Sequence, residues 1–273
     1  MTVLVTGATG NVGRHLIAEL LAAGRPVRAL TRHPERADLP DGVEVVEGDL
    51  TVPESLGPAL DGATALHLIT TGGDGFAPLR TGPDLVKLAA GAGVRRVTVL
   101  WSGVKGPVEE AVEASGLEWT LLQPVEFMSN ALQWAESIRT EGVAREPFGR
   151  QRAAVVHEAD IAGVAATALL EGGHGGRSYT LTGPEALTVP ERVAAIGAAI
   201  GRELRYVELT EEEARERMRR LGATEEVVDF VVGWHADPPA SAYTVVPTVE
   251  EVTGRPARTF AQWAAEHADA FRA

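Results

Sequence analysis

Three glycines near the start of the chain have the spacing of a phosphate-binding turn. Gly7, Gly10 and Gly13 follow a short apolar run, residues 3–5, and precede an amphipathic stretch, which predicts a strand, a turn and a helix. In such a turn the first glycine permits a sharp bend, the second lets bare backbone approach a pyrophosphate, and the third lets the helix pack closely. N–H groups at the helix start would face the phosphates. A structural turn without a ligand is the alternative.

A basic residue further along the chain indicates which dinucleotide would fit. Arg32 follows the second predicted strand, residues 26–31. An acidic residue at this place would bond the ribose 2′-hydroxyl of NAD(H), whereas an arginine accommodates the 2′-phosphate of NADP(H). Arg32 therefore predicts NADP(H). The alternative is a solvated arginine at a strand end, and Arg28 and Arg36 lie nearby in the sequence.

Strands and helices alternate through the first part of the chain. The predicted strands are residues 3–5, 26–31, 43–46, 63–69, 95–101, 117–122, 153–157 and 178–181. Intervening helices imply right-handed crossovers and a parallel sheet, so we expect an α/β fold with a doubly wound Rossmann sheet. Segments 48–50 and 70–75 follow two of the strands, at the edge where open α/β sheets bind ligands.

The remainder of the chain departs from this alternation and is mostly helical. Predicted helices cover residues 127–140, 189–200, 211–220, 225–234 and 261–271, and residues 142–151 are expected to form a loop or short hairpin. Thr210 and Glu213 are expected to form a capping box. We expect a Rossmann domain of residues 1–125 plus 153–182, and a small, mostly helical C-terminal substrate lobe of residues 126–152 plus 183–273.

The composition argues against several classes of protein. With a formal net charge of −13, the chain is not expected to bind nucleic acid or anionic membranes, because phosphate contacts need clustered Lys and Arg. It contains no cysteine, and no His, Asp or Glu spacing indicates a metal site. Without a signal sequence or a membrane-spanning apolar run, a cytoplasmic protein with a small-molecule substrate is expected. The oligomeric state stays open, a homodimer included.

Several segments together resemble the NmrA-like family of atypical short-chain dehydrogenase/reductases. The segments that carry the resemblance are residues 6–13, 27–32, 48–50, 115–124 with Phe127 and Met128, 160–162 and 179–184. The resemblance covers nearly the whole chain and implies a Rossmann cofactor domain, a small substrate lobe and NADP(H). With the turn, it gives an expected cofactor site of Gly7, Thr9, Gly10, Asn11, Val12, Gly13, Arg32, Asp49, Leu50, Thr70, Thr71, Lys105 and Pro124.

The proton donor of the wider superfamily is missing from this chain. Those enzymes carry Tyr-x-x-x-Lys on one helix face, where an ammonium lowers the pKa of a phenol beside the hydride acceptor. None of the three tyrosines here is followed by lysine four residues later. Lys105 aligns with the family's lysine and is expected to contact the cofactor ribose or to donate a proton. A solvated lysine before the Gly106-Pro107 break is the alternative.

Two further residues are candidates for catalysis. Ser102, just past the fifth predicted strand, would bond a substrate oxygen or cap the next turn. His235 is the candidate acid of the C-terminal lobe, the alternative being a surface histidine after a helix. His67 lies in an apolar strand and is expected to be a core residue. The expected catalytic residues are Lys105, His235 and Ser102, and the expected substrate pocket consists of Trp101, Phe127, Met128, Trp234 and His235.

The family includes reductases of quinones, isoflavones and other carbonyl or alkene substrates, and also cofactor sensors without catalysis. The missing tyrosine favours a quinone or enone, because the reduced anion is delocalised and needs less acid help than that of a simple ketone. An NADPH-dependent reductase of a small carbonyl, enone or quinone is therefore the first hypothesis. A non-catalytic NADP(H)-sensing regulatory protein is the alternative, and an isomerase or lyase that holds the cofactor is a third.

Overall fold

The computed structural model describes residues 1–73, 77–103 and 105–272 of the chain. These residues form two compact units. The first unit contains Met1–Pro124, Glu158–Leu181 and Thr248–Arg255, and the second contains Val125–His157, Thr182–Pro247 and Pro256–Ala273.

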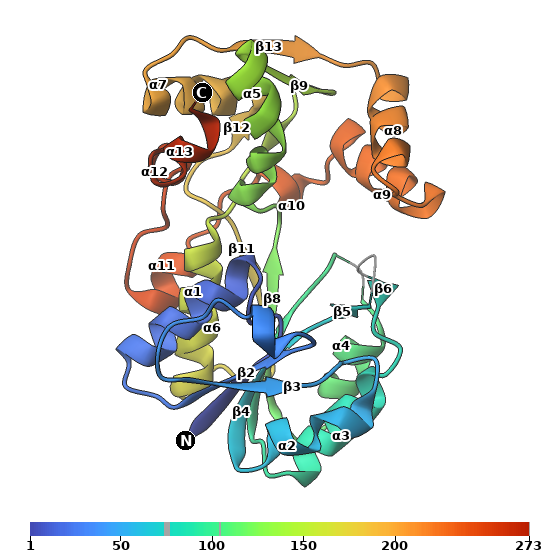
Figure 1. Cartoon of the computed structure of the whole chain (residues 1–273), viewed down its shortest axis with the longest axis vertical. Coiled ribbons are helices and arrows are strands. Elements are labelled where there is room, and N and C mark those ends of the chain that lie inside the picture. The colour runs from blue at the N-terminus through green and yellow to red at the C-terminus, as the bar shows by residue number, and fades with distance from the viewer. Residues whose placement is uncertain (74–76, 104, 273) are drawn as a thin grey trace. The chain divides into compact units, whose positions relative to one another are not determined.

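The first unit contains a seven-stranded parallel sheet, with strand order β11-β8-β7-β4-β1-β2-β3 (Figure 1). The strands are β1 (Thr2–Val5), β2 (Val27–Thr31), β3 (Val43–Glu47), β4 (Ala63–Ile69), β7 (Arg96–Leu100), β8 (Glu118–Pro124) and β11 (Arg177–Leu181). Central strands β1 and β4 are almost continuously apolar, as expected of strands covered on both faces. The predicted α/β class and parallel Rossmann sheet are confirmed.

Helices cover both faces of this sheet (Figure 1). One face carries α1 (Asn11–Ala22) and α6 (Glu158–Leu170), with α11 (Thr248–Thr253) packed on α6; the other carries α2 (Gly57–Leu60), α3 (Gly82–Gly91) and α4 (Pro107–Glu113). The short elements are η1 (Pro34–Arg36), η2 (Pro53–Leu56), β5 (Thr71–Gly72) and β6 (Ala77–Pro78). Helix α6 is rich in alanine, and these small side chains allow it to pack closely on both α1 and the sheet. It is therefore buried around nearly its whole circumference.

The second unit is mainly helical and has its own core. Its helices are η3 (Met128–Trp134), α5 (Ala135–Glu141), α7 (Val189–Ile200), α8 (Glu211–Arg220), α9 (Glu225–Ala236), α10 (Ala240–Tyr243), α12 (Phe260–Glu266) and α13 (Ala268–Phe271). Trp263 is fully buried in this core and stacks on Phe260, with ring centroids 5.3 Å apart. The predicted capping box at Thr210 and Glu213 is confirmed at the start of α8.

Four short strands also belong to the second unit. β9 (Val143–Glu146) pairs in parallel with β13 (Arg205–Glu208), and β10 (Arg152–Ala153) pairs antiparallel with β12 (Leu187–Thr188). The expected strand at residues 153–157 therefore does not join the main sheet. The expected α-helix at 127–140 begins as the 3₁₀-helix η3. In the first unit, Gly106 is the N-cap of α4, and the fixed φ of Pro107 suits the first position of that helix.

Residues 248–255 also differ from their expected place. The sequence groups them with the C-terminal lobe, whereas α11 packs against α6 and β11 of the first unit. The sequence of this short helix does not show which of the two cores it covers.

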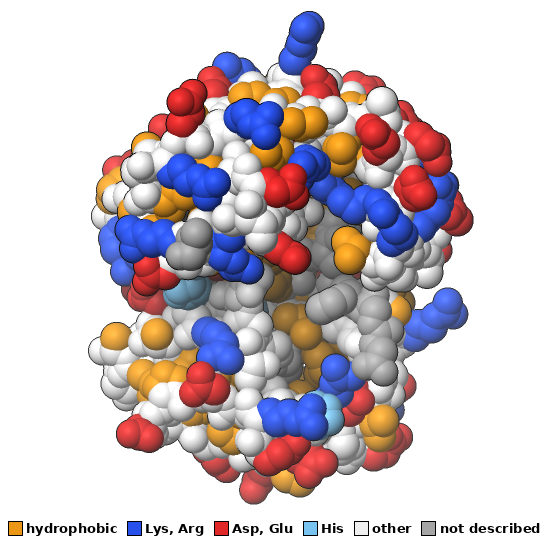
Figure 2. All heavy atoms as spheres, turned by 45° about the horizontal axis from the view of Figure 1, so that its top comes forward, with side chains coloured by type: hydrophobic (Ala, Val, Ile, Leu, Met, Phe, Trp, Pro, Cys, Tyr) orange, Lys and Arg blue, Asp and Glu red, His pale blue; other side chains and the backbone are white. Residues whose placement is uncertain are grey.

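The surface shows no segregation of charge on the face drawn in Figure 2, where acidic and basic side chains are interspersed over the coloured residues. Within the described ranges of the chain, no helix has both the length and the apolar character needed to cross a bilayer.

His67, in β4, is a core residue as expected. Its side chain is almost completely buried, and its Nδ1 lies 2.9 Å from the Thr98 hydroxyl. Burial lowers the pKa of His67 to about 4, because the interior disfavours the imidazolium. The imidazole is therefore neutral at neutral pH.

This burial predicts an acid-labile native state. The folded-state pKa of His67 lies below its unfolded-state value, so the unfolded state binds the proton more tightly and stability falls as the pH drops from about 6.5 to about 4. At about 1.4 kcal/mol per pKa unit, His67 lowers the free energy of unfolding by roughly 3 kcal/mol over this range. Urea titrations across the range should show a smaller loss in His67→Asn, whose side chain does not titrate. An equal loss in both proteins would contradict this prediction.

Candidate functional site

The glycine turn of the first unit is built as the sequence predicts. Gly7 has a φ of +61° and follows β1, and Gly10 is the N-cap of α1. A Cβ on Gly13 would lie 2.2 Å from the Gly7 carbonyl oxygen, so only glycine lets α1 approach the turn this closely. The Gly10 N–H donates to the Gly7 carbonyl at 2.9 Å. The turn thus presents the start of a twelve-residue helix at the edge of the sheet.

The turn lies where the strand order reverses. From β1 the chain proceeds outward through β2 and β3, and then returns to the other side of β1 as β4. Buried Thr6 joins the two central strands, because its hydroxyl accepts the Ile69 N–H at 3.0 Å and its own N–H donates to the His67 carbonyl. A crevice at such a reversal is the usual ligand site of an open α/β sheet.

Arg32 and Asp49 follow the neighbouring strands β2 and β3. The Asp49 carboxylate accepts the backbone N–H and the hydroxyl of Thr51, each at 2.8 Å. The N–H bond from Thr51 is the main reason that the pKa of Asp49 is lowered, and the positive charge of Arg32 lowers it further. Arg32 and the ionised Asp49 therefore lie at the same edge of the sheet as the turn of residues 7–13.

The other expected residues of the first unit lie at the same edge, at the ends of β4, β7 and β8. Thr70 is buried, and its hydroxyl donates to the Leu100 carbonyl at 3.4 Å. Thr71 lies in β5, and Pro124 ends β8; residues 74 and 75 of the expected 70–75 segment fall outside the described residues. Trp101 is half-buried and Ser102 is exposed.

Lys105 is held by an ion pair at the surface of the first unit. Its ammonium lies 2.5 Å from the Glu113 carboxylate in α4. The hydrogen bond to Glu113 raises the pKa of Lys105, which favours the charged ammonium. In this conformation the lysine is positively charged, and one of its N–H groups donates a hydrogen bond to Glu113.

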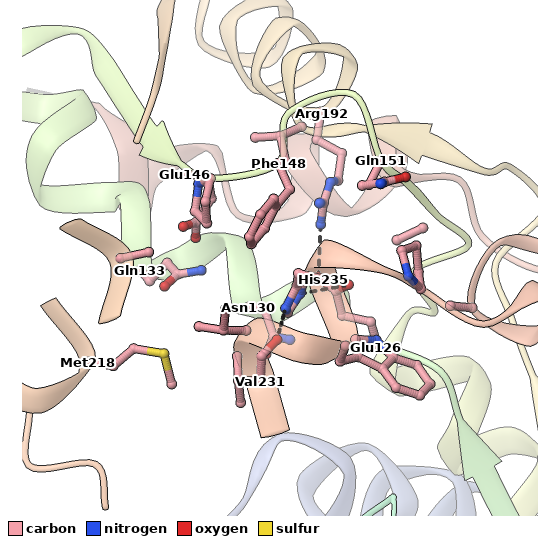
Figure 3. A pocket seen from close by; sticks show the side chains of 18 of the residues that line it. Glu126, Asn130, Gln133, Glu146, Phe148, Gln151, Arg192, Met218, Val231 and His235 are labelled. Carbon is pink, nitrogen blue, oxygen red and sulfur yellow. Dashed lines mark hydrogen bonds and ion pairs between the residues drawn. The ribbon is translucent and has the colours of Figure 1, made fainter. Parts of the chain in front are cut away.

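The second unit contains a pocket of about 430 Å³, within the range of small-molecule sites. The apolar part of its lining includes Trp134, Phe148, Met218, Leu221, Val231 and Trp234, and the polar part includes Glu126, Asn130, Gln133, Gln151, Arg192 and His235 (Figure 3). Trp234 and His235, both expected in the substrate pocket, line it. Met128, also expected there, is buried in the core of the unit, and Phe127 is half-buried outside the lining.

A charged triad occupies one wall of this pocket (Figure 3). The Arg192 guanidinium donates to Glu126 Oε1 at 3.0 Å, and His235 Nε2 lies 3.7 Å from Glu126 Oε2. Side chains of Arg192 and Glu126 are only 7% and 10% exposed, whereas that of His235 is 42% exposed. Burial would keep Glu126 neutral, but Arg192 and His235 outweigh it and lower the pKa of the carboxyl to about 2.

Phe148 is the most strained residue of the pocket. Among the described residues it is the only one other than glycine with a positive φ, 54°. Hydrogen bonds anchor its loop, since the Tyr206 hydroxyl donates to the Glu146 carbonyl at 2.8 Å and the Gly149 N–H donates to Glu208 at 3.2 Å. Figure 3 shows the ring pointing into the pocket. Strain of this kind is typical of functional sites.

Replacing Phe148 should separate its two effects. Phe148→Gly relieves the left-handed backbone, so we expect it to be more stable than Phe148→Ala by about 1 kcal/mol. Both variants lose the ring, and we expect the affinity of the pocket for a flat aromatic ligand to fall roughly tenfold in each, as for the loss of one aromatic contact. Thermal unfolding and ligand titration measure the two effects. Equal stabilities or an unchanged affinity would contradict the role given to Phe148.

Sequence reasoning missed Glu126, Phe148 and Arg192. Glu126 is an isolated acidic residue between Pro124 and Phe127, and Arg192 is an isolated basic residue in the apolar helix α7. Each is a charge placed where burial is expected, and a buried charge requires a partner. That signal indicates an ion pair but not which residues form it. Nothing in the sequence marks the positive φ of Phe148.

The sheet order and the glycine turn at its reversal define the first unit as a Rossmann-type dinucleotide-binding fold. The model of the NmrA-like family matches residues 1–230, and the chain belongs to this family.

Relatives match the chain over nearly its full length. A (4-alkanoyl-5-oxo-2,5-dihydrofuran-3-yl)methyl phosphate reductase of Streptomyces griseus is 41% identical, over 98% of this chain and 99% of the relative. An NAD(P)H azoreductase of Xenophilus azovorans is 36% identical, over 99% of both. The structure of an NADPH-dependent quinone oxidoreductase of Escherichia coli complexed with NADPH superposes with a TM-score of 0.80 at 25% identity, covering 97% of this chain and 99% of that one.

Proposed function

We propose that this protein is an NADPH-dependent reductase of a small, conjugated carbonyl, enone or quinone. The observation that carries the proposal is the turn at Gly7, Gly10 and Gly13, whose helix start lies at the edge of the sheet where the neighbouring strand β2 ends before Arg32. Full-length similarity to named reductases of this kind supports it.

The residues of the first unit fit a dinucleotide phosphate. Backbone N–H groups at the start of α1 would bind the pyrophosphate, because no side chain at Gly10 stands in its way. Arg32 would bind the 2′-phosphate that distinguishes NADPH from NADH. Asp49 would accept a hydrogen bond from the adenosine part. NADPH would supply the hydride, and the chain would supply binding and orientation.

The pocket of the second unit fits a flat acceptor of moderate size. Aromatic and aliphatic side chains form much of the lining, and its polar side chains include Glu126, Arg192 and His235. The relatives are named as reductases of an azo compound, a quinone and an unsaturated furanone, all of which are conjugated. Hydride addition to such a molecule gives a delocalised anion, so a weak proton donor suffices. This agrees with the lack of a Tyr-x-x-x-Lys pair in the sequence.

Loss of NADPH absorbance with a panel of quinones, enones and azo compounds tests the proposal. We expect turnover with at least one class and a preference for NADPH over NADH. In Arg32→Glu the preference should fall by roughly 100-fold, because a carboxylate repels the 2′-phosphate and favours the free hydroxyl. Arg36→Glu is the matched control, because it makes the same change of charge four residues later, at the end of η1. Tight NADPH binding without turnover on any acceptor would favour the cofactor-sensing alternative instead.

A further inference from the structure

We propose that His235 is the proton donor of this reductase and that Glu126, anchored by Arg192, is the positioning residue that keeps the donor protonated. The inference rests on the proposed function for its substrate, but the geometry of the three side chains belongs entirely to the second unit.

The hydrogen bonds of the imidazole fix which nitrogen titrates. His235 Nδ1 lies 2.8 Å from the carbonyl oxygen of Val231, one turn earlier in α9. A carbonyl oxygen only accepts, so Nδ1 carries a hydrogen in both protonation states. The proton that can be gained or lost is therefore on Nε2. The Nδ1 hydrogen bond fixes both the tautomer and the orientation of the ring. The acidic N–H at Nε2 therefore points in one direction.

One oxygen of the Glu126 carboxylate can stabilise the positive charge of a protonated His235. Oε1 accepts from Arg192, whereas Oε2 is buried, lies 3.7 Å from His235 Nε2 and makes no hydrogen bond within the described part of the chain. A buried, unpaired carboxylate oxygen costs free energy, and a protonated Nε2 beside it reduces that cost. The arrangement thus favours imidazolium over neutral imidazole.

The surrounding charges act in the same direction. Burial disfavours the imidazolium, but the interaction with Glu126 outweighs it and raises the pKa of His235 above its ordinary value, with a smaller contribution from Glu146 in β9. The arginines of the pocket wall do not reverse this, since each is bound to a carboxylate: Arg192 to Glu126, Arg217 to Glu146 and Arg152 to Glu191. Arg192 also prevents Glu126 from taking the proton itself.

His235 is placed to deliver the proton to a bound molecule. It lines the pocket, and its side chain is the most exposed of the three (Figure 3). As the substrate accepts a hydride at a conjugated carbon, the Nε2–H bond breaks and an O–H bond forms on the carbonyl oxygen. NADPH, when bound, would supply both electrons of the reduction; the imidazole is left neutral and regains its proton from water.

Measuring the His235 pKa by NMR, without cofactor or substrate, tests the first half of the inference. The chain has seven histidines, and the signal lost in His235→Asn assigns the one of interest. We expect an elevated pKa in the native protein and a fall of at least about one unit in Glu126→Gln, where burial remains but the negative charge is gone. Glu266→Gln is the matched control, because it removes a carboxylate 3.2 Å from another histidine of the same unit, His157. The His235 pKa should not change there.

The pH dependence of turnover tests the second half. A donor must be protonated to act, so kcat should fall as the pH rises through the His235 pKa, and this limb should move to lower pH in Glu126→Gln. We expect kcat near neutral pH to drop about tenfold in Glu126→Gln and further in His235→Asn, with NADPH binding unchanged.

The outcomes separate the two proposals. The inference is overturned if the His235 pKa does not change in Glu126→Gln. It is also overturned if that pKa changes but the pH profile of kcat does not. Neither result contradicts the proposed reductase function. No turnover in the native protein with any acceptor overturns the proposed function, and the NMR titration then still decides whether Glu126 controls His235. Since Glu126→Gln leaves Arg192 without its counter-ion, circular dichroism must first show that the variant is folded; if it is not, the native His235 pKa alone decides, and a value at or below the ordinary one overturns the inference.

Discussion

Gly13→Ala is expected to weaken NADPH binding by at least about 100-fold and to lower the free energy of unfolding by about 3 kcal/mol. The added Cβ would lie 2.2 Å from the Gly7 carbonyl oxygen and 2.9 Å from the Ala8 Cα. Both are backbone atoms, so no side chain can move aside, and α1 must shift away from the turn. The displaced helix start no longer directs its N–H groups at the pyrophosphate. Calorimetric titration with NADPH and thermal unfolding measure the two losses.

Gly91→Ala is the control for this substitution. Gly91 is also a helical glycine of the first unit, at the end of α3, and an added Cβ there meets no atom within 4 Å. We expect NADPH binding to be unchanged and stability to be unchanged or raised by up to about 1 kcal/mol. Native-like NADPH affinity in Gly13→Ala would refute the role given to the turn, whatever its melting temperature.

Arg192→Leu is expected to lower the free energy of unfolding by about 3–5 kcal/mol at neutral pH. The substitution leaves Glu126 ionised and nearly buried, with only the more distant His235 to compensate it. It also removes the guanidinium from above the Trp134 ring, 5.6 Å from its centroid. Urea unfolding followed by tryptophan fluorescence measures the loss.

Two comparisons distinguish a lost charge from lost packing. In the native protein the folded-state pKa of Glu126 lies below its unfolded-state value, so the pair stabilises at neutral pH and this contribution declines as the pH falls toward about 2. The deficit of Arg192→Leu should therefore shrink at about pH 4, where the unpaired carboxyl takes up a proton. Arg192→Leu combined with Glu126→Gln should recover most of the stability. A deficit that is equal at both pH values and in the double variant would show that packing alone was lost.

Local patterns predicted the fold class and the residues proposed to bind the cofactor. The strands at 3–5 and 63–69 and the glycine turn were predictable because a short apolar run, a tight turn and a helix start are each encoded by neighbouring residues. A parallel sheet then brings Arg32 and Asp49 to one edge whatever the details of packing, because every strand ends there. The prediction of a strand at residues 153–157 was wrong, because only Ala153 lies in a strand, β10, which pairs with β12 of the second unit and not with the main sheet.

Only the tertiary structure decided the substrate half. Glu126 and Arg192 are 66 residues apart in sequence, and His235 comes from a third segment. An isolated charge in an apolar segment indicates a buried ion pair, but the sequence does not show which residue is its partner. The sequence by itself thus determined a dinucleotide fold with a turn that admits no side chain at Gly13. The fold of the second unit decided that an unremarkable glutamate holds the proton on His235, because desolvation and charge are properties of a packed environment and not of neighbouring residues.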